Sequence, residues 1–213
     1  MAEEFARQYR GLILFGPFAP VDPEEIGVLE REIGQAIPPA YRSFLEVANG
    51  GTLEYSTRVP PSPEGDLVSF SDLHRLGPDQ HGEYGWGTLV GEYWELPHSW
   101  LAEQLPVATL LPIARTGGGD QLLLDPAPNR HGRVLGVVHG LPEWTGLETR
   151  DRWGVLADDF DAYLDGLFLD PDVAKEMWSD AADQDPADPW RQVVEQWLDS
   201  GLPGWRREPW AAR

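Results

Sequence analysis

The sequence contains no cysteine, which excludes disulfide bonds, thiolate metal sites and thiol nucleophiles. It also contains no run of about 18 apolar residues, the length needed to cross a bilayer. The first ten residues, MAEEFARQYR, lack the basic and then apolar order of a secretion signal. These absences predict a cytoplasmic protein without a membrane partner.

Basic residues are scarce. The chain has 16 lysines and arginines against 36 aspartates and glutamates, and its formal net charge is −20. A surface of this charge repels nucleic acids and anionic membranes and attracts basic partners. We therefore expect no nucleic-acid binding, although solubility alone is an alternative explanation of the charge. The charge is also uneven, because Asp151 to Asp199 holds fourteen acidic and three basic residues.

Residues 22–51 have the pattern of two short amphipathic helices. Asp22 can cap the first helix, and Pro23 suits its first position, where a missing N–H leaves no donor unpaired. Gly34 ends this helix, and Asn49 with Gly50 and Gly51 supplies left-handed residues after the second. The predicted buried positions are Ile26, Leu29 and Ile33, followed by Tyr41, Phe44, Leu45 and Ala48.

Three apolar runs further along predict an antiparallel meander, with a glycine turn between the first two. These runs are Thr109–Ala114, Gln121–Leu124 and Val134–Val138. Asp158 is the predicted N-cap of a helix that begins near Phe160. Two more helices are expected near 172–179 and 188–200, whereas 77–106 is expected to be irregular.

These elements, in this order, resemble the SUKH superfamily of Smi/Knr-type domains over roughly residues 22–168. The resemblance lies in the Ile26–Gly51 helical pair, the Leu111–Asp125 strand, glycine turn and strand, and the Phe160–Phe168 helix. It implies an α+β fold with a central antiparallel sheet. It also implies a binding function, most concretely that of a bacterial immunity protein.

The glycine run before Asp120 invites comparison with a phosphate-binding loop. Such loops need a helix behind them to supply aligned N–H donors, but a strand follows here. We interpret the run as a tight β-turn in which Gly117, Gly118 or Gly119 has a positive φ. Asp120 and Asp125 resemble family positions, and we interpret both as side chains that bond local N–H groups.

Catalytic patterns are missing elsewhere. The histidines have no HExxH or HxH spacing, and no GxSxG elbow is present. Asp158, Asp159 and Asp161 fit a helix start better than a metal cluster. The sequence therefore predicts a protein that is not an enzyme and has no cofactor or metal.

One segment combines tyrosines and tryptophans with carboxylates, the composition of interfaces that accept arginine or lysine. The predicted partner-binding residues are Glu83, Tyr84, Trp86, Glu92, Tyr93, Trp94 and Glu95. Alternatively, these aromatic side chains cover the sheet as a lid.

At 213 residues and 41% hydrophobic composition, the chain can bury one core. We predict a SUKH-like domain over 1–168 and an acidic helical extension docked on it over 169–213. The predicted function is non-enzymatic binding of a basic toxin, for example a nuclease, as the resemblance implies. A regulatory or scaffold protein of the same fold is one alternative, and an enzyme that uses the acidic cluster is another.

Overall fold

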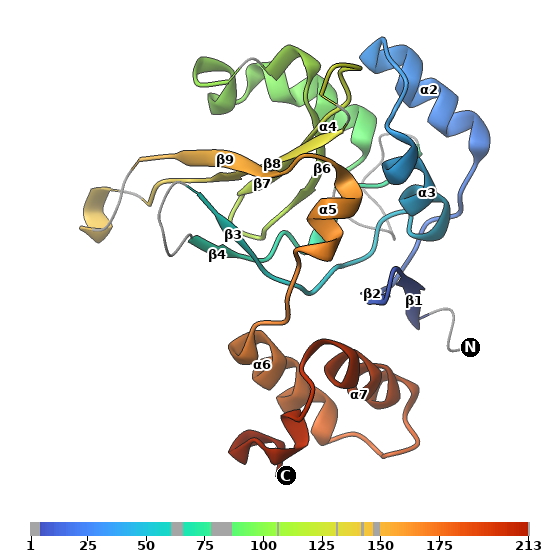
Figure 1. The fold of residues 1–213 in the computed structure, drawn as a ribbon, viewed down its shortest axis with the longest axis vertical. Helices are drawn as coiled ribbons and strands as arrows, with labels where there is room; N and C mark the ends of the chain where they lie inside the picture. Colours follow the sequence, from blue (N-terminus) through green and yellow to red (C-terminus); the bar gives the residue numbers. More distant parts are fainter. Residues whose placement is uncertain are drawn as a thin grey trace.

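The computed structural model describes residues 5–60, 66–77, 87–105, 107–130, 132–141, 143–146 and 150–212. Its centre is an antiparallel sheet in the order β5-β6-β7-β8-β9 (Figure 1). The strands are β5 (Asp72–Leu73), β6 (Leu111–Arg115), β7 (Gln121–Asp125), β8 (Arg133–Val138) and β9 (Arg152–Ala157). The predicted meander, β6 to β8, is confirmed, and β5 and β9 extend it on either side.

Two hairpins complete the β structure. The first, β1 (Ala6–Tyr9) and β2 (Leu12–Phe15), continues the sheet because Thr52 bridges Phe15 and Asp72. The second, β3 (Thr57–Val59) and β4 (Asp66–Val68), packs against one face of β8 and β9. A Cβ at Gly154 of β9 would lie 2.4 Å from Cγ of Pro60, so glycine allows this close approach.

The helical pair forms as predicted, with α2 (Pro23–Ile33) and α3 (Pro39–Val47). Asp22 accepts the N–H of Glu24, and Gly34 ends α2 with a φ of 72°. All seven positions predicted to be buried are buried. Helix α5 (Phe160–Asp165) packs on this pair through contacts of Phe160 with aromatic rings of α3. Its N-cap is Asp159, so the prediction of Asp158 was wrong.

The opposite face of the sheet is covered by a segment that was expected to be irregular. It contains α4 (Leu89–Glu95) and the 3-10 helices η1 (Leu96–His98), η2 (Trp100–Glu103) and η3 (Val107–Thr109). Together with Leu123, Leu135 and Val137 of the sheet, the apolar residues between Leu96 and Leu110 form a second, smaller core, whereas Leu89 of α4 belongs to the main core. Another 3-10 helix, η4 (Glu143–Thr145), lies between β8 and β9.

The C-terminal region consists of α6 (Pro171–Ala182), α7 (Pro189–Gly201), η5 (Trp205–Arg207) and η6 (Pro209–Ala211) (Figure 1). Both long helices begin with an Asp-Pro pair, in which Asp170 or Asp188 accepts backbone N–H groups of the first turn. Helix α7 packs on β2, where its residue Trp197 contacts the Phe15 ring. None of the described helices has the length and apolar character needed to span a membrane.

Candidate functional site

Four of the predicted partner-binding residues lie together on α4. Thr88 starts this helix, because its Oγ1 accepts the N–H of Gly91 at 3.0 Å. The four residues are Glu92, Tyr93, Trp94 and Glu95. The other three predicted residues, Glu83, Tyr84 and Trp86, lie outside the described residues.

The aromatic side chains of α4 divide between the core and the surface. Tyr93 is half-buried against the main core, and its hydroxyl donates to the carbonyl of Ala108 at 3.4 Å. Trp94 is 56% exposed, although its ring meets that of Tyr93 edge-on at 5.9 Å. Tyr93 therefore covers the core as a lid, and Trp94 is available for contact with another molecule.

The two carboxylates of α4 also differ. Glu95 is exposed, whereas Glu92 is half-buried and faces the segment around Gly87. A Cβ at Gly87 would lie 2.6 Å from Oε1 of Glu92 and 2.7 Å from Nδ1 of His74, so glycine lets the backbone pass between these groups. Burial and the charge of Arg115 lower the pKa of His74 to about 3. His74 is thus neutral at pH 7 and adds no positive charge beside Glu92.

A groove of about 670 Å³ lies at one end of the sheet, between β4 and the β6–β7 turn. His139 lines it, with Nδ1 3.5 Å from Oδ1 of Asp151 and its ring 3.7 Å from that of Trp100. Asp120 accepts the backbone N–H of His139 at 2.8 Å and contacts Thr116 Oγ1 at 3.1 Å. Asp120 was predicted to bond N–H groups of its own turn, but the backbone N–H that it accepts belongs to His139, so its side chain joins the β6–β7 turn to the end of β8.

The glycine turn has the predicted geometry. Gly119 has a φ of 93°, and Gly118 donates its N–H to Thr116 Oγ1 at 3.1 Å. Asp125 is fully buried, where it accepts the N–H of Ala127 at 3.2 Å and a bond from Arg130 at 2.8 Å. The glycine turn and Asp125 thus both have structural roles.

The Asn-Gly-Gly run after α3 also has a structural role. Gly50 and Gly51 both have a φ of 81°, and a Cβ at Gly51 would lie 2.5 Å from the carbonyl oxygen of Phe15. Asn49 is buried, and its side chain accepts the N–H of Leu76 at 2.6 Å and donates to the carbonyl of Pro20 at 2.8 Å. Asn49 was predicted to be left-handed, but among the described residues Arg10 is the one non-glycine residue with a positive φ, and the amide of Asn49 instead ties three segments together.

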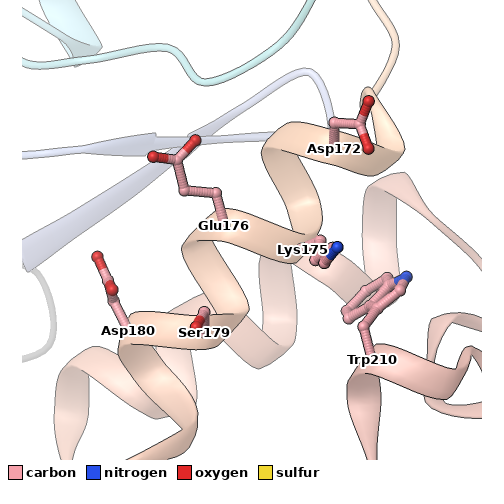
Figure 2. Close-up of a pocket in the computed structure, with 6 residues that line it drawn as sticks. All are labelled: Asp172, Lys175, Glu176, Ser179, Asp180 and Trp210. Carbon is pink, nitrogen blue, oxygen red and sulfur yellow. The ribbon is translucent and has the colours of Figure 1, made fainter.

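A second groove, of about 380 Å³, lies on the C-terminal region between α6 and η6 (Figure 2). It is lined by Asp172, Lys175, Glu176, Ser179, Asp180 and Trp210. Figure 2 shows Lys175 beside the Trp210 ring, with Glu176 and Asp180 directed away from Trp210. Over the part of the chain that the structure describes, no group of three or more histidines or acids could hold a metal ion.

The sheet, the helical pair and α5 together define an α+β domain with helices on both faces. A family model described as the SMI1 / KNR4 family (SUKH-1) matches residues 20–166, and the chain belongs to this family. The match begins just before α2 and ends just after α5. No curated protein and no solved structure matches the chain. Domains of this family generally bind protein partners and are not enzymes, so the chain fits an immunity-type binding module.

Proposed function

We propose that this protein is an immunity protein that neutralises a basic toxin domain, such as a nuclease, by binding it through the outer side of α4. The observation that supports this most directly is the exposure of Trp94, 56%, on a helix otherwise packed on the core. The exposed part of a large apolar side chain gains no hydrophobic stabilisation in the folded chain. Tryptophan is, however, among the residues most enriched at the centres of interfaces.

The surroundings of Trp94 favour a cationic partner. Glu95 is exposed next to it, and Glu92 lies two residues before it on the same helix. The whole chain carries a net charge of −20. An indole face and a carboxylate together can hold a guanidinium or ammonium group by cation–π and ionic contacts. A nuclease uses such groups to bind phosphates, so covering them would block its substrate.

The test is binding to a toxin domain encoded next to this gene, measured by surface plasmon resonance. Trp94→Ala should weaken binding by about 2 kcal/mol, or roughly 30-fold, as expected for a central anchor. Glu95→Gln should mainly lower the association rate, and the loss should shrink as salt is added.

Trp144→Ala is the matched control, because Trp144 is 86% exposed but lies on a different element, η4. If the Trp94→Ala and Trp144→Ala variants bind the toxin domain with equal affinity, α4 is not the interface. If the protein binds a partner but does not protect cells from the toxin, a regulatory or scaffold function replaces immunity.

A further inference from the structure

The groove at the end of the sheet has a volume of about 670 Å³, within the range of about 300–1,000 Å³ common for ligand sites. One wall consists of residues 67–69, on and just after β4, and another consists of residues 138–141. Because side chains of a strand alternate between two faces, a wall of successive residues indicates that the groove runs along the backbone of β4. The groove therefore has the form of a site for an extended chain.

The backbone of β4 offers hydrogen-bonding groups to this groove. Among the described residues β4 forms a ladder with β3 alone, and residues 67–69 make no hydrogen bond beyond that ladder. Alternate residues of an antiparallel strand direct their N–H and C=O groups away from the partner strand. The outer edge of β4 can therefore pair with a further strand of three or four residues, about 10–14 Å long at about 3.4 Å per residue.

The opposite wall offers a side chain instead of its backbone. Asp120 accepts the N–H of His139, and Asp151 accepts the N–H of Gly140, both at 2.8 Å. The carboxylate of Asp151, 3.5 Å from Nδ1 of His139, favours the tautomer with its proton on Nδ1, so Nε2 is an acceptor. Nε2 faces the β6–β7 turn that lines the groove, 4.0 Å from the position of a Cβ at Gly119. Among the described residues it has no hydrogen-bond partner.

The groove has an apolar character on both walls. Leu67 is 46% exposed on one wall, and Leu141 is 47% exposed on the other. Val68 and Val138 are buried and line the same groove. Apolar side chains of an occupant would cover the two leucines and remove this area from water.

The charged residues that line the groove already have partners within the chain. Both carboxylate oxygens of Asp120 are engaged, one by the N–H of His139 and the other by the hydroxyl of Thr116 at 3.1 Å. Arg152 also interacts within the chain. A charged side chain placed here would be covered without a free opposite charge, which is unfavourable. The groove therefore suits an uncharged segment, in contrast to the basic partner proposed for α4.

We propose that this groove binds an extended, uncharged peptide segment of another protein. The segment pairs as a strand with the outer edge of β4, and its apolar side chains contact Leu67 and Leu141. One of its N–H groups donates to Nε2 of His139. None of the groove residues belongs to α4, so this site is independent of the proposed immunity function.

Nuclear magnetic resonance of the full-length protein with methyl-labelled leucines tests the proposal. The probe is the capped peptide Ac-Thr-Val-Leu-Val-Thr-NH₂, which should shift the methyl signals of Leu67 and Leu141 with a dissociation constant of about 1 mM or lower. The matched probe is Ac-Thr-Val-Pro-Val-Thr-NH₂, because proline removes a main-chain N–H and interrupts strand pairing while it stays apolar. It should bind at least about 10-fold more weakly.

Variants of the protein test the two walls. Leu67→Glu and Leu141→Glu should each weaken binding by at least about 10-fold, with unchanged circular dichroism because both side chains are exposed. Val28→Glu is the matched control, since Val28 is an exposed aliphatic residue on α2 outside the groove, and should leave the affinity unchanged. His139→Phe keeps an aromatic ring beside Trp100 but lacks the acceptor, and should weaken binding about 5-fold.

Three results would each overturn the proposal. The first is the absence of leucine methyl shifts at about 2 mM of the leucine peptide. The second is equal binding of the proline peptide, which would show that the groove does not pair with a main chain. The third is an affinity that Leu67→Glu leaves unchanged.

Discussion

Trp197 provides a test of how the C-terminal helices contribute to folding. It is fully buried on α7, and its ring meets those of Phe15 at 5.8 Å and Tyr55 at 6.2 Å, both edge-on. Phe15 belongs to β2 and Tyr55 precedes β3, so this one side chain joins the C-terminal region both to the N-terminal hairpin and to the family domain. Truncating it should therefore destabilise the whole protein and not the C-terminal helices alone.

The magnitude follows from two opposing terms. An aromatic side chain buries about 150–250 Å², which at about 25 cal/mol per Å² gives about 4–6 kcal/mol as an upper estimate. The indole N–H of Trp197, however, is buried without a hydrogen-bond partner among the described residues. Such a donor costs about 1–3 kcal/mol, and truncation removes that cost. Trp197→Ala should thus lose about 3 kcal/mol, whereas Trp197→Phe should lose less than about 1 kcal/mol.

Urea unfolding followed by far-ultraviolet circular dichroism measures both changes, because the ten tryptophans make fluorescence difficult to assign. We expect one transition that moves to lower urea for Trp197→Ala. A loss below about 1 kcal/mol would refute the argument. A second, separate transition of small amplitude would also refute it, since it would show that α6 and α7 unfold as an independent domain.

Three further predictions concern individual residues. Burial, with the charges of Asp72 and Glu176, raises the pKa of Glu54 above its ordinary 4.5, so the folded state holds this proton more tightly and stability falls as the pH rises above that value. Glu54→Gln should therefore raise the urea midpoint at about pH 7 and have little effect at about pH 4. Gly119→Val should cost about 2 kcal/mol in urea unfolding because of its φ of 93°, whereas Gly117→Val, without a positive φ, should cost less. Leu45→Ala should cost about 2–5 kcal/mol, and a loss under about 0.5 kcal/mol would show that the α3 face is not core.

Local signals predicted much of this fold. The helical pair was predicted because capping residues, apolar spacing and glycine stops all fall within thirty residues and agree with one another. The β6–β8 meander was predicted because each apolar run is bounded by turn residues. The family resemblance rests on these same segments, and the family match covers them.

The remaining elements depend on distant contacts that leave weak local patterns. Strand β9 contains Gly154, which is needed because Pro60 packs too close for a Cβ, and the apolar residues of β9 are partly exposed. Helix α4 has seven residues, two of them aromatic, and covers a sheet whose strands lie further along the chain. Its cap, Thr88, and its inward and outward aromatic residues, Tyr93 and Trp94, could be distinguished only once the sheet was in place.

The acidic C-terminal half shows why charge alone is a weak guide to a binding surface. Asp159, Asp170 and Asp188 are N-caps, and each accepts a backbone N–H at the start of a helix. Asp165 pairs with Arg10, and Asp199 pairs with Arg206 and accepts the indole N–H of Trp205. These carboxylates are engaged in the fold, so their charge contributes to steering but not to a dedicated contact surface. We therefore propose α4 as the surface that a basic partner contacts, because Glu95 is exposed there beside the largely exposed Trp94.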